Sequence, residues 1–209
     1  ARAGARTLEP VGGPSLTRPL YPDPHSPTGR LSASPGPSTP RLPSNPGSIL
    51  VVRLSARGDV VFSSAMIPAL RRTYPDARIT WVVEESAQDY VRHNPRLDRV
   101  LVLPRRTSVR ELRQGRVVEA TGRLGAFLGE LRSRDYDVAL DLQGLMKSAL
   151  VAYLSGARVR FGLGAAEGSR LLHHRVIPRT GHGYVRPSSE YFHLARTLGL
   201  DTGDFAMDV

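Results

Sequence analysis

The chain has 209 residues and a formal net charge of +10, carried by 28 arginines and a single lysine, Lys147. The absence of cysteine excludes disulfides and thiolate metal sites, and no apolar run approaches the ~20 residues of a membrane span. The basic charge favours an anionic partner, but the aromatic residues are few and are not interleaved with the arginines, so we expect no nucleic acid. With no apolar signal segment visible, we expect a cytoplasmic location.

Residues 1–47 differ in composition from the rest of the chain. They contain 11 Pro, 6 Gly and 6 Ser, almost half the stretch, and no apolar run. Such a segment cannot bury enough apolar surface to offset the entropy lost on ordering. We therefore predict a disordered tail over 1–47 and one folded domain over 48–209.

From residue 48 onward, short apolar runs alternate with segments whose apolar residues recur at helical spacing. Predicted strands cover 48–54, 78–83, 99–103, 138–141, 158–161 and 175–177. Predicted helices cover 60–74, 86–93, 117–134, 142–154 and 188–198, with a polar loop or the start of a surface helix at 105–116. This alternation predicts an α/β fold, a Rossmann-like doubly wound parallel sheet.

Two loops stand out in this pattern, at 55–59 after the first strand and at 141–147 after the fourth. In the usual strand order 3-2-1-4, the first and fourth strands are neighbours. Ligands of such sheets bind in the crevice outside the carboxyl ends of these strands. We therefore expect the two loops to open into one shared crevice.

The first loop reads Leu-Ser-Ala-Arg-Gly-Asp and ends at Asp59, where a helix begins. Asp59 is either an acid that complements the helix dipole or a general base that takes a proton from a substrate hydroxyl. Gly58 would let the backbone turn sharply and a ligand approach closely. Because a helix N-terminus stabilises a carboxylate, a base here would need partial desolvation or a neighbouring acid.

The second loop contains Asp141, Gln143 and Gly144, followed by Lys147 and Ser148. Helical spacing puts Gln143 and Lys147 on one face, with Ser148 adjacent. Lys147 could there meet an anionic ligand. The alternative is an ordinary capped helix with a solvated lysine.

Three other motifs give weaker signals. Asp135-Tyr136-Asp137 has the spacing of a metal-binding acid pair, but it precedes the fourth strand and so lies at the opposite edge of the sheet. His173-His174 would point apart on a strand, a poor geometry for a metal. Arg105-Arg106 is either a solvated turn or a contact for an anionic substrate.

Three segments carry a family resemblance: ILVVRLSARGDVV, PALRRTYPDARITWVVEE and YDVALDLQGLMKSALVAYLSGARVRFGL. In order and spacing they resemble the N-terminal half of the family 9 glycosyltransferases, the ADP-heptose:lipopolysaccharide heptosyltransferases. The match covers most of 48–200. It implies the N-terminal half of a GT-B fold, in which this domain holds the acceptor and a second, C-terminal domain binds the nucleotide sugar.

The resemblance also implies roles for residues. Asp59 would be the general base of an inverting, metal-independent transfer of heptose from ADP-heptose to the Kdo-lipid A inner core. No cofactor is implied, and the donor would bind mainly the C-terminal domain, which the 209 residues lack. The implied partners are the anionic acceptor, the nucleotide sugar and the cytoplasmic face of the inner membrane. The acceptor side would be lined by Ser55, Arg57, Gly58, Gln143, Gly144, Lys147 and Ser148.

The sequence departs from the family pattern at one segment, and one alternative function remains open. The family's His-x-V-[DE]-R run before the last helix appears here as Arg-Pro-Ser-Ser-Glu at 186–190, so the resemblance carries no acceptor contact for this segment. Because no second domain follows, we expect the isolated 209 residues to be inactive. The alternative is a non-catalytic acceptor-binding module, or a truncated inactive homologue.

Overall fold

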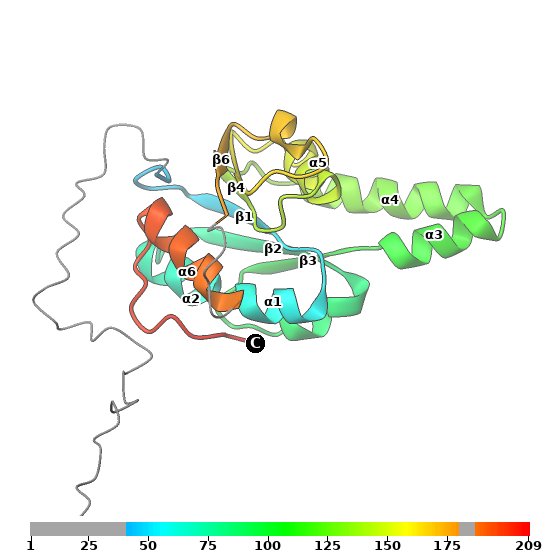
Figure 1. Ribbon diagram of the computed structural model, residues 1–209. Helices are drawn as coiled ribbons and strands as arrows, with labels where there is room; N and C mark the ends of the chain where they lie inside the picture. Colours follow the sequence, from blue (N-terminus) through cyan, green and yellow to red (C-terminus); the bar gives the residue numbers. More distant parts are fainter. Residues whose placement is uncertain (1–40, 180–186) are drawn as a thin grey trace, which may run out of the picture. The chain divides into compact units, whose positions relative to one another are not determined.

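The computed structural model describes residues 41–179 and 187–209. Its centre is a six-stranded parallel sheet in the order β3-β2-β1-β4-β5-β6 (Figure 1). The strands are β1 (Ser48–Val52), β2 (Arg78–Glu84), β3 (Arg99–Leu103), β4 (Val138–Asp141), β5 (Val159–Leu163) and β6 (Arg175–Ile177). The predicted parallel α/β sheet, with the first and fourth strands adjacent, is confirmed.

Helices cover both faces of the sheet, which explains why its central strands are apolar throughout. On one face Ile49 and Val51 of β1 belong to a core that includes residues of α1 (Arg57–Ser63), α2 (Met66–Thr73) and α6 (Pro187–Leu198). On the other face Leu50 and Val52 belong to a core that includes residues of α4 (Val117–Arg132) and α5 (Met146–Leu154). No helix within the described residues is long and apolar enough to cross a membrane.

The helices differ from the prediction at several places. The helix expected at 60–74 is divided into α1 and α2, and at the break the hydroxyls of Ser63 and Ser64 donate to the carbonyls of Val60 and Val61. Serine hydroxyls compete in this way with the helical hydrogen bonds. The other differences are a 3₁₀ turn, η1 (Glu85–Tyr90), in place of the helix at 86–93, a full helix α3 (Arg105–Arg113), and a later start of α5.

The packed part of the chain begins before the predicted boundary at residue 48. Leu42 is buried, and its N–H donates to the Leu198 carbonyl over 3.4 Å. The Tyr74 hydroxyl donates to the Pro43 carbonyl over 3.2 Å. Residues 41–47 therefore pack with the domain, whereas residues 1–40 of the predicted tail lie outside the described residues.

The sheet register fixes where the two unusual loops meet. Val52 at the end of β1 is paired with Asp141 at the end of β4. At the opposite end of β1, the Asp137 carboxylate accepts hydrogen bonds from the N–H groups of Gly47 and Ser48. Asp137 therefore anchors the start of β1, at the edge away from the loops, where the sequence placed it.

Candidate active site

A cavity of about 540 Å³ opens beside the carboxyl ends of β1 and β4. Residues from both predicted loops line it, together with residues that follow β6 and begin α6. The lining comprises Arg53, Ser55, Ala56, Asp59, Gln143, Leu145, Lys147, Arg179, Glu190 and Tyr191. The expected shared crevice is present.

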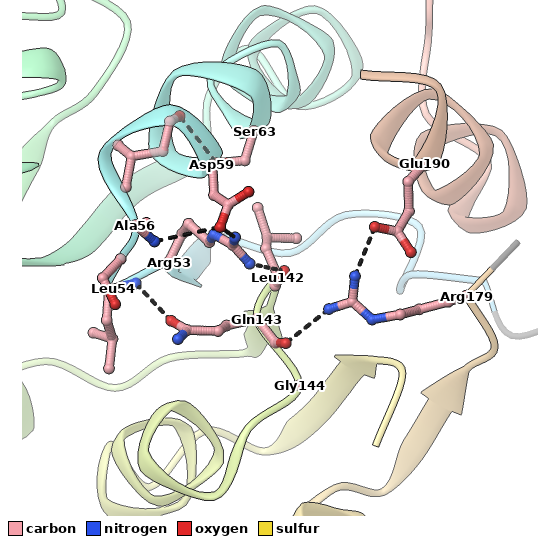
Figure 2. Close-up of polar contacts among 12 residues, drawn as sticks. Arg53, Leu54, Ala56, Asp59, Ser63, Leu142, Gln143, Gly144, Arg179 and Glu190 are labelled. Atoms are coloured by element: carbon pink, nitrogen blue, oxygen red, sulfur yellow. Dashed lines mark hydrogen bonds and ion pairs between the residues drawn. The ribbon is translucent and has the colours of Figure 1, made fainter. Parts of the chain in front are cut away.

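Asp59 enters this cavity from the first turn of α1. Its Oδ2 atom accepts a hydrogen bond from Ala56 N–H (3.3 Å) and pairs with the Arg53 guanidinium (2.5 Å) (Figure 2). Among the described residues no group bonds the other oxygen, Oδ1, and the side chain is 49% exposed. One oxygen of Asp59 thus accepts a hydrogen bond at the N-terminus of α1, while the other is free to bind a ligand in the cavity.

Arg53 holds that carboxylate from within the core. Its side chain is only 6% exposed, and a second nitrogen donates to the Leu142 carbonyl over 2.8 Å. Sequence analysis missed this residue, although an arginine that ends an apolar strand was itself a signal, because buried charges are almost always paired. Of the two features that a base here would need, partial desolvation or a neighbouring acid, the second is not the direct partner of Asp59: that partner is the Arg53 guanidinium, which fixes the orientation of the carboxylate.

The second loop is shaped by the buried carboxylate of Asp141. This side chain accepts hydrogen bonds from the N–H groups of Gln143 (2.8 Å) and Gly144 (3.0 Å) and from the Ser148 hydroxyl (2.9 Å). Such local bonds turn the chain, so α5 begins at Met146 and Gln143 lies in the loop rather than on the helix. Ser148 is fully buried, which gives it a structural role in place of the predicted contact with an acceptor.

A histidine packs behind this loop. The side chain of His173 is fully buried, and its Nε2 atom lies 3.3 Å from Asp141 Oδ2. A Cβ atom at Gly162 would stand 2.4 Å from the imidazole ring, so glycine leaves the space that the ring fills. Within the described residues, no group of three or more potential metal ligands gathers here or elsewhere.

Lys147 is tied into the crevice rather than freely solvated. Its ammonium group donates to the Ser55 hydroxyl (2.9 Å) and to the Glu84 carboxylate (3.0 Å). Gln143 is held as well, because its side-chain oxygen accepts a hydrogen bond from Leu54 N–H (3.2 Å). Hydrogen bonds from the residues after β1, from the end of β2 and from the two loops therefore hold these side chains in place.

Two predicted residues of the first loop lie outside the lining of this cavity. Gly58 is inside the first turn of α1 and does not adopt a positive φ, so the sharp turn expected of it is absent. Arg57 is exposed and donates to the Ser86 carbonyl (2.8 Å). The helix begins earlier than predicted, and this places both residues on its first turn.

Three lining residues were not predicted because they come from the far end of the chain. Arg179 donates to the Gln143 carbonyl (2.8 Å) and to the Glu190 carboxylate (2.6 Å), as Figure 2 shows. Burial, with the nearby carboxylates of Asp59 and Glu190 adding to it, raises the pKa of Tyr191 to about 12. Its phenol therefore stays protonated at neutral pH and can donate a hydrogen bond.

A second cavity, of about 650 Å³, lies beside the first at the ends of β2 and β3. Glu84 links the two, since it pairs with Lys147 on one side and with Arg105 (3.7 Å) on the other. Four of its nine lining residues are arginines. The lining comprises Glu84, Glu85, Ser86, Arg105, Arg106, Thr107, Val109, Arg110 and Arg113. Of the two interpretations of Arg105-Arg106, the cavity favours an anion contact over a solvated turn.

The Gly144→Ala variant is expected to lose about 3 kcal/mol of unfolding free energy in urea. Gly144 has φ +70°, and a Cβ atom there would lie 2.2 Å from the Leu163 carbonyl oxygen. Gly156→Ala is the matched control, because Gly156 has φ +74° but no atom within 4 Å of a Cβ. The control should lose only about 1 kcal/mol, the strain of the left-handed backbone alone. Equal losses would show that the loop moves freely away from β5.

The sequence of this chain is similar to those of known proteins. Residues 124–203 match the family model of glycosyltransferase family 9 (heptosyltransferase). Lipopolysaccharide heptosyltransferase 1 of Campylobacter coli is 30% identical over 114 residues, 54% of this chain and 30% of the relative. The enzyme of the same name from Pseudomonas aeruginosa is 28% identical over 167 residues, 77% and 46% of the two chains. The chain thus spans less than half the length of these relatives.

Solved structures share the fold. Escherichia coli heptosyltransferase WaaC with ADP-2-deoxy-2-fluoro heptose superimposes with a TM-score of 0.62 at 24% identity, over 75% of this chain and 50% of that one. A family 9 glycosyltransferase from Veillonella parvula gives 0.62 at 20% identity, over 78% and 44%. In sequence over residues 124–203 and in fold, the chain is therefore similar to glycosyltransferase family 9, the heptosyltransferases.

Proposed function

We propose that the crevice is the acceptor side of an inverting, metal-independent heptosyltransferase that uses Asp59 as its general base. The enzyme would transfer heptose from ADP-heptose to the Kdo-lipid A inner core of lipopolysaccharide. The observation that carries this proposal is the Asp59 carboxylate, which lies half-exposed in the cavity with one oxygen held by Arg53 and the other unbonded among the described residues.

In this mechanism the acceptor hydroxyl donates its proton to Asp59 Oδ1 as its oxygen attacks the anomeric carbon of heptose. The bond from that carbon to the diphosphate breaks, and ADP leaves with the electron pair. Attack from the face opposite ADP inverts the anomeric centre. Arg53 stays on Oδ2 throughout, and Asp59 later releases the proton to solvent.

The charges of the two cavities suit an anionic acceptor. Lys147 and Arg179 line the first cavity, and Arg105 and Arg106 line the second. Ser55 and Gln143 add polar groups beside Asp59. We propose that these side chains bind the phosphate and carboxylate groups of the acceptor, with Arg57 at the rim. The donor would bind mainly a C-terminal domain outside the 209 residues, and the reaction would need no cofactor.

The direct test is to express the product of the complete reading frame that contains this chain, and to assay it with ADP-heptose and Kdo-lipid A. Mass spectrometry should show the addition of one heptose to the acceptor. The 209 residues alone should give no transfer but should still bind the acceptor. If the complete product binds the acceptor yet transfers nothing, the domain is the alternative, a non-catalytic binding module.

A further inference from the structure

Helices α3 and α4 form a hairpin joined by the three residues 114–116. Figure 1 shows the two helices side by side, with the linking turn at the end farthest from the sheet. The turn is closed by backbone bonds from Gln114 N–H to the Arg110 carbonyl (3.2 Å) and from Arg116 N–H to the Glu111 carbonyl (2.9 Å). The hairpin therefore presents a fixed tip.

Exposed apolar side chains lie on both sides of this turn, in the second half of α3 and at the start of α4. Val118 is 81% exposed, Val117 53%, Leu112 45% and Val109 40%. Single exposed apolar residues are ordinary, but four within ten residues around one turn form a patch of the kind that marks an interaction site. We refer to Val109, Leu112, Val117 and Val118 as the apolar tip.

None of these four side chains belongs to either of the two hydrophobic cores. Between the helices Ser108, Glu111 and Ala120 are buried, and Arg123 of α4 pairs with Glu111 of α3 over 2.8 Å. The Arg123 contact lowers the pKa of Glu111, so this carboxylate is ionised at neutral pH. The apolar tip is thus available to a partner.

Cations surround the apolar tip. Residues 105–124 contain six arginines against two glutamates, a net charge of +4. One glutamate, Glu111, is buried and already paired with Arg123. Over residues 41–179 and 187–209, no carboxylate pairs with the exposed arginines at four positions: Arg106, Arg110, Arg113 and Arg116.

We infer that the α3–α4 hairpin docks, tip first, on the surface of a bilayer that contains anionic phospholipid. Valine and leucine side chains would enter the boundary between headgroups and acyl chains, and the arginines would contact lipid phosphates. Arginine suits this position because its apolar stem lies along the tip while its guanidinium reaches the headgroups. Neither feature alone would favour a lipid surface over another anionic partner, but the two together do.

This docking deepens the proposed function, on which it rests for its biological purpose but not for its test. The second cavity starts at Arg105 and Arg106, the first residues of α3. A hairpin seated on the bilayer would therefore hold the cation-rich cavity close to an acceptor that is itself anchored in lipid. Vesicle binding requires no heptose transfer, so either proposal can fail without the other.

The test is co-flotation of the 209-residue protein with vesicles of phosphatidylcholine alone and with about 30% phosphatidylglycerol, a membrane of clearly negative surface potential. The protein should bind the anionic vesicles, and binding should fall when salt rises from about 0.1 M to 1 M, where charges are screened over a few ångströms. V117S/V118S should bind at least fivefold more weakly, and so should R113Q/R116Q.

The matched control is R170Q/L171S, which removes the same kinds of side chain from an exposed site outside the hairpin, where Leu171 is 88% exposed. This control should bind vesicles like the wild type. Because all forms carry the same residues 1–40, a difference in vesicle binding between them is due to the substituted residues. Unchanged binding of V117S/V118S, or no binding by the wild type, overturns the inference. Loss of self-association in V117S/V118S without vesicle binding also overturns it and makes the tip an interface between two copies.

Discussion

If the complete protein is the proposed heptosyltransferase, replacing Asp59 by asparagine is expected to lower kcat by about 10²–10⁴-fold, the contribution of a general base. Asparagine keeps an oxygen that can accept from Ala56 N–H and from Arg53, so α1 should still begin at the same residue. Alanine is a poorer choice, because it would leave the buried Arg53 without its partner. Rates at saturating ADP-heptose and acceptor, measured by mass spectrometry, give the result.

The rate and the free energy of unfolding of Asp59→Asn together distinguish a general base from a residue that only caps the helix. If Asp59 only complemented α1, Asp59→Asn would lose stability and keep its rate. As a base it should lose its rate, while the free energy of unfolding falls by no more than about 1–2 kcal/mol. Asp76→Asn is the control, since Asp76 is exposed and lies between α2 and β2, away from the crevice. A near wild-type rate for Asp59→Asn would remove Asp59 from the mechanism.

The sequence predicted the strands and loops that form this site, because they depend on local patterns of apolar residues. Apolar runs gave the six strands, and the rule for strand order brought β1 beside β4, as the register of Val52 and Asp141 confirms. The sequence alone therefore predicted that the two loops open into one crevice. Asp59 and Lys147 lie in it because each stands within a few residues of a strand end.

The rest of the site depends on contacts that no local pattern encodes. Arg179, Glu190 and Tyr191 reach the cavity only because β6 and α6 return to the edge of the sheet. The family resemblance placed Ser148 on the acceptor side, yet Ser148 is buried and its hydroxyl donates to the Asp141 carboxylate. Such bonds become visible only when the distances are known.

Arg53→Lys is expected to lower kcat by about 10–100-fold, because the lysine ammonium cannot reproduce the fixed fork that bonds both the Leu142 carbonyl and Asp59. The carboxylate would then sample orientations in which Oδ1 no longer faces the acceptor hydroxyl. Arg71→Lys is the control, since Arg71 also pairs with an aspartate, Asp98, but at the far side of α2. Its kcat should be unchanged.

The decisive measurement is the double variant, because Arg53 is proposed to act only through Asp59. If it does, Arg53→Lys costs nothing further once Asp59 is asparagine, and the double variant is as slow as Asp59→Asn alone. If Arg53 served the fold alone, the two losses would multiply and the double variant would unfold at a lower urea concentration. Non-additive rates at equal stability therefore identify Arg53 as the residue that positions the base. The contribution of Arg53 to the reaction would then be geometric: it holds one oxygen of Asp59 so that the other faces the acceptor hydroxyl.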